Sequence, residues 1–299
     1  MNFALIGCGN IGILYDYENP KKLLTYYSTI NSNKFYRLIA VCDLNKKKKK
    51  LIDKRVNFFS NLKKMLICSP EINVVIISSS TSSHYKILKQ VLKSKVQYIV
   101  CEKPFLLDIN KAKKIIKLIK KYKKKIIINY SRRFSPEIIQ LVGKIKNNFL
   151  FNIEKISITT SRGLINNGCH YIDLIRMIFG NNVDVLSKDL YKSKYIKNDF
   201  CGRVKLLVKN KIIVYIQIKD FKKKFCEKVI FYAKKNIIQI LDYKKIIFTN
   251  IKKQNKKIVK INRSVQLTNL LKNLNSTYLS SVQNAVKNNK ILNEIIYKR

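Results

Sequence analysis

The sequence has no tryptophan, and glycine and proline are scarce, with eight and four residues among 299. No apolar run approaches the roughly 18 residues needed to cross a bilayer, so no membrane segment is predicted. Acidic residues number only 17, against 62 Lys and Arg. The apolar fraction of 46% nevertheless excludes a disordered chain. At this length we expect two domains, each able to bury a core of its own.

The formal net charge of +45 would normally indicate a nucleic-acid or anionic-membrane partner. The lysine excess, however, accompanies many Ile, Asn and Tyr residues, which is the amino-acid usage that an AT-rich genome imposes through its codons. Lysine runs at 46–50 and 123–125 are typical of exposed helix ends and loops. No patch interleaves Arg with stacking aromatic residues, as nucleic-acid binding usually requires. We therefore expect no specific nucleic acid and no membrane as partner, and a basic nucleic-acid-binding protein is kept as an alternative.

Histidine is also scarce, with two residues, and the seven cysteines form no CxxC pair. No metal site is predicted, because two histidines and dispersed cysteines give no ligand cluster. Nucleophilic catalysis lacks support as well, since there is no G-x-S-x-G elbow. No basic segment precedes the apolar N-terminal residues, so no export signal is expected. An odd number of cysteines, several inside apolar runs, indicates reduced, mostly buried thiols in the cytoplasm: Cys8, Cys42, Cys68, Cys101, Cys169, Cys201 and Cys226.

The first half of the chain alternates short apolar strands with amphipathic helices. This alternation predicts an α/β fold over residues 1–134, with parallel βαβ units in a doubly wound Rossmann sheet. Strands are expected at 3–6, 38–42, 74–78, 98–100 and 126–128, and helices at 85–92 and 109–122.

Past residue 135, strand-like runs follow one another with one clear helix among them. This pattern predicts an α+β domain over 135–299 with a mostly antiparallel, open sheet. We expect this domain to bind the substrate and to mediate a homo-oligomer through the sheet. Leu267–Ala285 is predicted to be one amphipathic helix. The expected strands lie at 153–159, 204–208, 211–218, 227–232, 236–241 and 245–249, and the helix at 170–178.

A glycine motif follows the first strand directly. Gly7, Gly9 and Gly12 occupy the positions of G-x-G-x-x-G at a strand-to-helix junction. The first glycine allows a tight bend, the second lets the backbone approach a pyrophosphate, and the third permits close helix packing. The helix N-terminus would face the phosphates. Asn10 and Ile11 complete the predicted cofactor-binding loop.

Asp43 ends the second strand, where a carboxylate can accept hydrogen bonds from both hydroxyls of a ribose, which favours NAD. It comes later than the roughly 20 residues expected after the motif. An extra segment at about 15–24 accounts for the surplus. A plain turn residue is the alternative for Asp43. Lys46 and its neighbours can still receive a 2′-phosphate, which keeps NADP open.

Four segments in order resemble the landmarks of the Gfo/Idh/MocA family, the glucose-fructose oxidoreductase and inositol dehydrogenase group. The resemblance covers residues 3 to about 180, and the rest is consistent by length and pattern only. It implies an NAD(P)-dependent oxidoreductase acting on a secondary hydroxyl of a sugar or nucleotide sugar, similar to members in surface-polysaccharide synthesis. The segments are the glycine motif, Glu102-Lys103-Pro104, Asn129-Tyr130-Ser131-Arg132-Arg133-Phe134 and Gly168-Cys169-His170-Tyr171-Ile172-Asp173.

The resemblance implies two catalytic residues. Lys103 matches the family's active-site lysine, where a cation lowers the cost of a developing alkoxide and helps to shuttle its proton. Its bond to Pro104 is expected to be cis. His170 matches the family histidine proposed as acid and base toward the substrate hydroxyl. Without the family, a lysine before proline is usually a surface residue, and a histidine such as His170 can be a satisfied buried one.

Three further residues are implied on the cofactor side: Ser79 in the Ser/Thr cluster after the third strand, His84 and Glu102. The alternative for His84 is a structural residue at a helix start.

On the substrate side, Arg133 resembles a family position near the cofactor or substrate, whereas Arg132 is expected to face solvent. Asp173 lies one helical turn after His170, where it orients the histidine or forms a surface pair.

Asn166 departs from the family pattern, which usually carries an aspartate four residues before the histidine. Asparagine cannot take a proton or hold a negative charge, although it can hydrogen-bond a sugar hydroxyl. Either Lys103 and His170 suffice, or the reaction differs, or activity is lost. A non-catalytic NAD(P)-binding sensor or partner protein on the same fold is therefore the first alternative to the enzyme.

Overall fold

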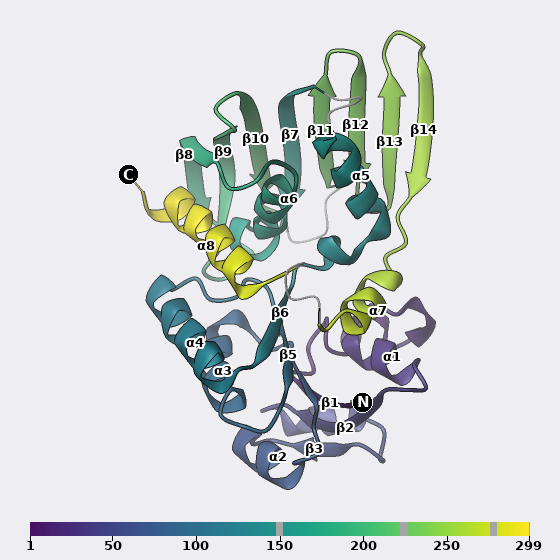
Figure 1. The fold of residues 1–299 in the computed structure, drawn as a ribbon, viewed down its shortest axis with the longest axis vertical. Coiled ribbons are helices and arrows are strands. Elements are labelled where there is room, and N and C mark those ends of the chain that lie inside the picture. The colour runs from purple at the N-terminus through teal and green to yellow at the C-terminus, as the bar shows by residue number, and fades with distance from the viewer. Residues whose placement is uncertain (148–151, 222–226, 276–279, 299) are drawn as a thin grey trace. The chain divides into compact units, whose positions relative to one another are not determined.

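The structure is a computed structural model that describes residues 1–147, 152–221, 227–275 and 280–298 (Figure 1). Cys226 lies outside the described residues. The chain divides into two compact units: unit 1 contains Met1–Ser131 and Ser264–Val286, and unit 2 contains Arg132–Arg263 and Lys287–Arg299. No described helix is both long and apolar enough to cross a bilayer.

Unit 1 is built on a six-stranded parallel sheet in the order β3-β2-β1-β4-β5-β6. This is the order of the dinucleotide-binding doubly wound fold, so the predicted Rossmann sheet is confirmed. The sequence did not predict β3, a three-residue, only partly buried strand. The strands are β1 (Asn2–Ile6), β2 (Arg37–Cys42), β3 (Asn57–Phe59), β4 (Val74–Ile77), β5 (Tyr98–Glu102) and β6 (Lys125–Asn129).

The helices after the third and fourth predicted strands form close to where the periodicity places them. These helices are α3 (Thr81–Val91) and α4 (Ile109–Tyr122), and a shorter helix, α2 (Leu62–Cys68), was not predicted. The Asp108 carboxylate caps α4 by accepting a 3.0 Å hydrogen bond from the N–H of Lys111.

The helix expected directly after the glycine motif is interrupted. Ile13 N–H donates to the Gly9 carbonyl at 2.9 Å, which makes one helical turn. The chain then leaves through two short 3-10 turns, Leu14–Asp16 and Pro20–Lys22, before α1 (Tyr26–Asn31) begins. The extra segment predicted at 15–24 is therefore an insertion within the first Rossmann helix.

Two backbone hydrogen bonds span this insertion. Tyr26 N–H donates to the Ile11 carbonyl at 3.1 Å, and Tyr27 N–H donates to the Gly12 carbonyl at 3.0 Å. Helix α1 therefore continues the turn of the glycine loop, although a dozen residues separate them in the sequence.

Unit 2 is built on an eight-stranded sheet in the order β14-β13-β12-β11-β7-β10-β9-β8. Among the described strands of this sheet, only the β7–β10 pair is parallel, which confirms the mostly antiparallel prediction. The unpredicted strands, β8 and β14, are the two edges, where exposed polar residues hide the alternation. The strands are β7 (Ile153–Ser161), β8 (Val183–Lys192), β9 (Phe200–Val208), β10 (Ile212–Lys219), β11 (Lys228–Ala233), β12 (Asn236–Leu241), β13 (Lys245–Asn250) and β14 (Asn255–Lys260).

Two helices of unit 2 precede and follow β7. Helix α5 (Pro136–Lys146) was not predicted, whereas α6 (Cys169–Phe179) lies where the apolar periodicity indicated. Nearly every residue of α6 is buried, and Gly180, with a φ of +91°, follows its last turn.

The prediction of one helix over Leu267–Ala285 is wrong. The structure has α7 (Val265–Lys272) and α8 (Val282–Tyr297). Helix α7 ends where Asn273 N–H turns back to the carbonyls of Asn269 and Leu270. The Asn-rich residues that follow favour a turn over further helix, because their side chains compete for backbone hydrogen bonds.

Part of the C-terminal third is grouped with unit 1. Ile128 N–H on β6 donates to the Ser280 carbonyl at 2.9 Å, and the Tyr98 hydroxyl on β5 donates to Asn275 at 2.8 Å. The sequence-based division into 1–134 and 135–299 places all of these C-terminal residues in one domain. Contacts across 150 residues of chain leave no local signal in the sequence.

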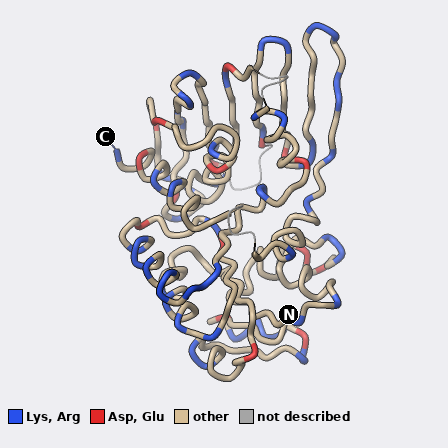
Figure 2. The backbone as a smooth tube through the Cα atoms, in the orientation of Figure 1, with Lys and Arg blue, Asp and Glu red and all other residues tan. Residues whose placement is uncertain are grey.

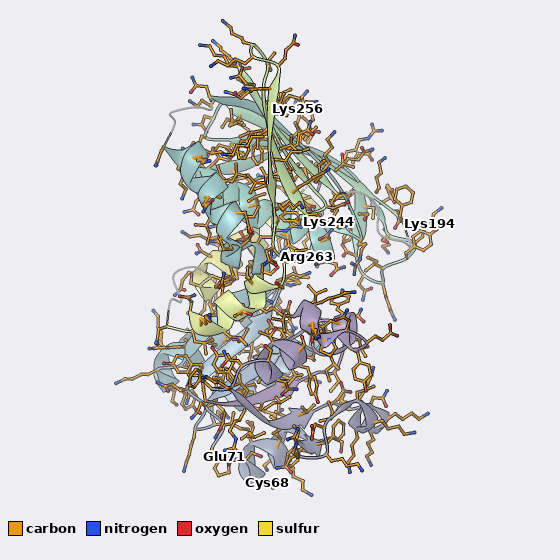
Figure 3. All side chains as sticks on the ribbon, turned by 90° about the vertical axis from the view of Figure 1, so that its right-hand side faces the viewer. Cys68, Glu71, Lys194, Lys244, Lys256 and Arg263 are labelled. Atoms are coloured by element: carbon orange, nitrogen blue, oxygen red, sulfur yellow. The ribbon has the colours of Figure 1, made fainter. Side chains whose placement is uncertain are left out.

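Lysine and arginine are spread over the loops, helices and hairpin ends of each unit (Figure 2). The labelled lysines of unit 2 come from separate elements: Lys194 follows β8, Lys244 lies in the β12–β13 turn and Lys256 lies on β14 (Figure 3). A dispersed distribution agrees with compositional bias as the source of the charge.

Candidate active site

The glycine turn after β1 has the backbone shape that its residues predict. Gly7 has a φ of +98°, and a Cβ there would lie 2.7 Å from the backbone nitrogen of Ser79. A Cβ on Gly12 would overlap the Gly7 carbonyl oxygen. At Gly9 a Cβ would meet open space, so the chain itself does not require glycine there. Open space at the second glycine fits the close approach of a pyrophosphate.

The two residues between these glycines differ in exposure. Asn10 is exposed and Ile11 is half-buried. The Asn10 carbonyl accepts a 2.9 Å hydrogen bond from Tyr15 N–H, which ties the loop to the start of the insertion.

Asp43, which directly follows β2, is half-buried beside the glycine turn. Its Oδ2 accepts a 2.7 Å hydrogen bond from the backbone N–H of Cys8, and its Oδ1 accepts one of 2.8 Å from Asn45 N–H. Each carboxylate oxygen has a second lone pair, which can accept a ribose hydroxyl. The five lysines 46–50 follow in a 3-10 helix capped by the Asn45 side chain. Both cofactor features of the sequence, the acid and the lysines, therefore lie together.

His84 is buried and connects two loops of unit 1. Its Nε2 lies 3.1 Å from the Ser79 carbonyl and its Nδ1 lies 3.2 Å from the Phe105 carbonyl. Burial lowers the pKa of His84, against the smaller opposing effect of these carbonyls. The ring therefore connects the loop after β4, through Ser79, to the segment that contains Lys103, through Phe105. The half-buried Ser79 hydroxyl is hydrogen-bonded to Ser83 at 2.7 Å.

Glu102 is a buried carboxyl at the end of β5. Its Oε1 accepts hydrogen bonds from the Tyr26 hydroxyl at 2.8 Å and from Asn129 Nδ2 at 2.6 Å. Sequence reasoning placed Glu102 at the cofactor and missed Tyr26, which is brought to it from α1. No local pattern could have indicated Tyr26, because 76 residues separate the two.

Lys103 follows Glu102 and is half-buried, between a buried glutamate and the buried Pro104. The Lys103–Pro104 peptide bond is cis, as expected. The lysine is thus held at the carboxyl end of the Rossmann sheet, where ligands of such sheets bind.

His170 lies in the first turn of α6 in unit 2 and is half-buried. A π-helical turn, Leu164–Gly168, runs directly into α6 and contains Asn166. Such turns are rare and are frequent at functional sites. The side chain of Asn166 donates to the Arg162 carbonyl at 3.2 Å.

A buried aspartate, Asp199, holds this π-helical turn. Its carboxylate accepts 2.8 Å hydrogen bonds from the backbone N–H groups of Ile165 and Asn166. A Cβ on Gly163, which has a φ of +81°, would overlap the same carboxylate. Asp199 lies 33 residues from Asn166 in the sequence, which is why sequence reasoning missed it.

Arg133 and Asp173 form a buried, bidentate ion pair in unit 2. Arg133 Nε donates to Asp173 Oδ2 at 2.8 Å and Nη2 donates to Oδ1 at 2.8 Å. Asn288 Nδ2 donates to the same Oδ1 at 2.7 Å. The expectation that Asp173 forms a surface pair is wrong, because its side chain is only 3% exposed. Arg133 and Asp173 are therefore ion-pair partners within unit 2.

The expectation that Arg132 faces solvent is also wrong. Its guanidinium carbon lies 3.5 Å from the ring centre of Tyr243 and 4.2 Å from that of Tyr171. Arg132 Nη2 lies 3.6 Å from Glu227 Oε2, which also accepts from the Tyr171 hydroxyl at 2.7 Å. Stacking on two rings and pairing with a carboxylate offset the cost of burying the charge. The partners come from α6, from the β12–β13 turn and from the residue before β11, so the sequence offers no local signal for them.

The structure thus gathers the predicted residues into two groups. In unit 1, Glu102 ends β5, His84 lies in α3, and the others come just after strands: the glycine turn, Asp43, Ser79 and Lys103. In unit 2, Asn166 and His170 share one helical segment, and Arg133 is paired to Asp173. Among the described residues, no group of three or more His, Cys, Asp or Glu is placed to hold a metal ion. Cys68 is exposed, and the other five described cysteines are buried.

Residues 1–130 match the model of a family described as an oxidoreductase family with an NAD-binding Rossmann fold. These residues, fewer than half of the chain, match the Gfo/Idh/MocA oxidoreductase family that the sequence motifs resemble. The predicted nicotinamide dinucleotide cofactor is confirmed as a class, since the family model describes an NAD-binding domain.

Among curated proteins, the chain is similar to inositol 2-dehydrogenase from Rhizobium meliloti (strain 1021). The two are 22% identical over 160 residues, which is 54% of this chain and 45% of the relative. The chain spans about half the length of the curated relatives it matches.

Solved structures share the fold over nearly the whole chain. A dehydrogenase (MviM) from Clostridium difficile aligns with a TM-score of 0.78 at 18% identity, covering 100% of this chain and 99% of that one. KijD10, a 3-ketoreductase from Actinomadura kijaniata solved with NADP and TDP-benzene, aligns with a TM-score of 0.79 at 8% identity, covering 99% and 97%. The TM-scores show that the chain shares the fold of these structures.

Proposed function

We propose that this protein is an NAD(P)-dependent oxidoreductase that transfers a hydride between the nicotinamide and a secondary hydroxyl of a sugar or nucleotide sugar. The observation that carries the proposal is the glycine turn with Asp43 on a Rossmann sheet that also ends in the half-buried Lys103. The names of the similar proteins, an inositol dehydrogenase and a 3-ketoreductase crystallised with a TDP compound, support a polyol or sugar substrate. A role in surface-polysaccharide synthesis is part of the same proposal.

The residues present fit the cofactor. Gly9 leaves open space above the turn, and Asp43 keeps lone pairs for ribose hydroxyls. When bound, the nicotinamide supplies the carbon that gives or takes the hydride. The chain's own part is to bind the dinucleotide, to stabilise the developing alkoxide with Lys103 and to exchange its proton through His170. Asn166 would hydrogen-bond the substrate.

NAD is favoured over NADP in this proposal. The Asp43 carboxylate matches a free 2′-hydroxyl and repels a 2′-phosphate. Lysines 46–50 act in the opposite direction, because a phosphate attracts them. The carboxylate is fixed by two backbone N–H groups, whereas lysine side chains on an exposed turn are flexible, so the aspartate should dominate.

Thermal unfolding with NADH or NADPH tests cofactor binding. A ligand at about 100 times its Kd adds roughly 2.7 kcal/mol and visibly raises the midpoint. Turnover is then measured with inositols, free sugars and nucleotide sugars. Lys103→Met should lower kcat by about a hundredfold or more with cofactor binding intact, and His170→Asn should do the same. Lys113→Met, on the exposed face of α4, is the matched control. No cofactor binding in the wild type would refute the proposal.

A non-catalytic NAD(P)-binding protein is the second candidate. Asn166, at the position of the family's usual aspartate, favours it. Asn166→Asp separates the two: turnover that appears only in this variant supports the non-catalytic reading, whereas a wild type that already turns over supports the enzyme.

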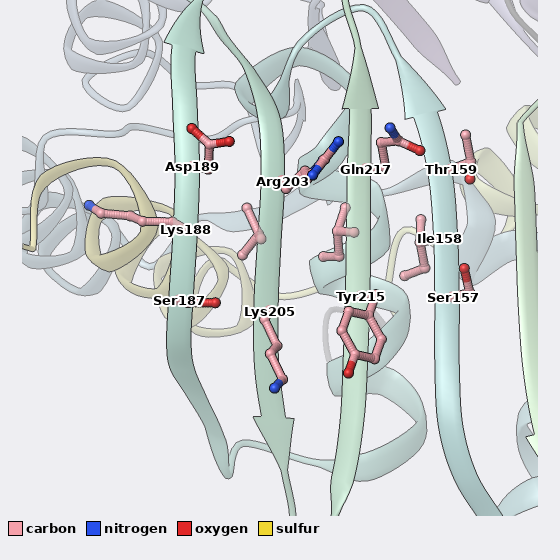
Figure 4. Close-up of a pocket in the computed structure, with 12 residues that line it drawn as sticks. Ser157, Ile158, Thr159, Ser187, Lys188, Asp189, Arg203, Lys205, Tyr215 and Gln217 are labelled. Carbon is pink, nitrogen blue, oxygen red and sulfur yellow. The ribbon is translucent and has the colours of Figure 1, made fainter.

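We also propose that the open sheet of unit 2 mediates a homo-oligomer and that the protein works in the cytoplasm without a specific nucleic-acid partner. The strands β7 to β10 expose a shallow hollow of about 640 Å³ lined by Ser157, Thr159, Lys205, Tyr215 and Gln217 (Figure 4). Light scattering of the wild type and of Tyr215→Glu tests the oligomer, and a wild-type monomer would refute it.

A further inference from the structure

Three buried polar side chains meet at the carboxyl end of β5 and β6. Asn129 Nδ2 donates to the Tyr26 hydroxyl at 2.7 Å and to Glu102 Oε1 at 2.6 Å, and the Tyr26 hydroxyl donates to the same Oε1 at 2.8 Å. Tyr26, Asn129 and Glu102 are 0%, 2% and 8% exposed. Two donors therefore converge on one carboxylate oxygen out of contact with bulk water.

The surroundings of Glu102 have two opposite effects on its ionised form. Burial raises the pKa of Glu102, while the Asn129 bond, the charge of Lys103 and the Tyr26 bond each lower it. A buried carboxyl with no role would cost less as an apolar residue. The hydrogen bonds from Tyr26 and Asn129 hold one oxygen of Glu102 at a fixed place.

Tyr26 reaches Glu102 because the insertion is anchored from within. Asp16 is buried and accepts 2.6 Å hydrogen bonds from the N–H of Leu24 and from the hydroxyls of Thr25 and Ser28. Thr25 caps α1, so these bonds fix the helix start that presents Tyr26. The backbone N–H of Tyr26 in turn donates to the Ile11 carbonyl of the glycine loop.

We propose that Tyr26 and Asn129 are positioning residues that hold Glu102 as the fixed anionic neighbour of Lys103. Glu102 and Lys103 are adjacent in the chain, and opposite charges attract, so a fixed carboxylate restricts where the ammonium group lies. Tyr26 also joins this pair to the glycine loop that binds the dinucleotide. The inference deepens the proposed function and rests on Lys103 being the active-site lysine.

A triad that only fills the core and a triad that positions Glu102 predict different results for Tyr26→Phe. If the triad only fills the core, removing the Tyr26 hydroxyl lowers stability and leaves the pH dependence of turnover unchanged. If it positions Glu102, the same change shifts the titration of Glu102 and the acid limb of kcat/KM together. Protonation removes the charge that attracts Lys103, so turnover falls as the pH drops through the pKa of Glu102.

The first experiment follows the Glu102 carboxyl carbon by ¹³C NMR in protein labelled at glutamate, with the signal assigned by its loss in Glu102→Gln. The chain has only seven glutamates, which keeps the spectrum simple. Tyr26→Phe should raise the Glu102 midpoint by about one pH unit, the size of one hydrogen bond to a charged group. Tyr27→Phe is the matched control, because it lies on the same helix and its hydroxyl accepts from Asp53 N–H instead. An unmoved midpoint in Tyr26→Phe overturns the inference.

The second experiment measures kcat/KM against pH with the substrate found in the screen. The acid limb should move upward in Tyr26→Phe by the same amount as the NMR midpoint, and should vanish in Glu102→Gln with kcat about tenfold lower. Asn129→Leu, which removes the other donor, should move both in the same direction and serves if Tyr26→Phe does not fold. A moved midpoint with an unmoved limb overturns the inference alone. A wild type without any turnover refutes the proposed function, and the catalytic meaning of the triad with it.

Discussion

The carboxylate of Asp43 accepts a 2.7 Å hydrogen bond from the backbone N–H of Cys8, inside the glycine motif. The residue that the sequence assigned to the ribose therefore also fixes the end of β2 against the turn that faces the pyrophosphate. Its second oxygen is held by Asn45 N–H, so the carboxylate is oriented before any ligand arrives. Preorganisation of this kind reduces the entropy lost on binding.

Asp43→Asn should weaken NADH binding by about tenfold, roughly 1.4 kcal/mol. The amide keeps one acceptor oxygen but loses the charge and turns an NH₂ group toward one of the two backbone N–H donors. NADPH binding should weaken less, because the repulsion of a 2′-phosphate is removed as well. Fluorescence titration of both cofactors measures the ratio. Asp53→Asn, at an exposed acid paired with Arg55, is the control. Equal losses for both cofactors would contradict the assignment of Asp43 to the ribose.

Arg133→Met should lower the free energy of unfolding by about 3–5 kcal/mol, because it leaves Asp173 buried as an unpaired charge. Urea denaturation at neutral pH measures the loss. Arg55→Met removes an exposed ion pair and should change stability by less than about 1 kcal/mol. The double variant Arg133→Met with Asp173→Leu should recover most of the loss. Comparable small effects for Arg55→Met and Arg133→Met would show that the buried pair is not held in solution.

Stability should decrease below about pH 6.5 through His84. Its folded-state pKa is lowered by burial, so the unfolded chain binds a proton that the folded chain does not. The stability is therefore complete above the ordinary histidine pKa and is lost as the pH falls toward the folded value. His84→Gln should flatten this dependence when unfolding is measured between pH 7.5 and 5.5. The other histidine, His170, serves as the matched site: if His170→Gln flattens the curve and His84→Gln does not, the prediction is wrong.

Glu102→Gln should stabilise the protein more at pH 8 than at pH 5, although it lowers activity. Burial raises the pKa of Glu102, so the folded state binds its proton more tightly than the unfolded state does. The stability contributed by this carboxyl is thus present below its ordinary pKa and declines as the pH rises through the folded value. Thermal melts at both pH values measure the difference. Glu154→Gln, exposed on β7, should show none of it, and a Glu102→Gln gain that is the same at both pH values would contradict the argument.

Predictions from the sequence succeeded where the information is local. Strands β1, β2, β4, β5 and β6 are continuous apolar runs because parallel strands are buried on both faces, and the glycine spacing marks the turn directly. They failed at the sheet edges β8 and β14, where exposed polar side chains break the alternation, and at α1, where an insertion splits the helix.

The sequence also failed to predict the partners of buried charged side chains. Arg132 and Arg133 are adjacent, yet one stacks between Tyr171 and Tyr243 and the other pairs with Asp173. A sequence shows that a charged residue is present. It does not show whether the fold brings a carboxylate from another element next to it. The same holds for Tyr26, which no motif marked.

The sequence by itself determined the Rossmann sheet and the dinucleotide turn, because periodicity and motif spacing are properties of neighbouring residues. The two catalytic candidates, Lys103 and His170, were implied by the resemblance of its motifs to a known family. Only the tertiary structure decided that Asp43 also fixes the glycine turn, that Tyr26 and Asn129 converge on Glu102, and that Arg133 belongs to Asp173. These pairings join residues 27 to 76 positions apart. They form because burial removes water as a competing partner, so each buried charge or donor must find its partner within the fold.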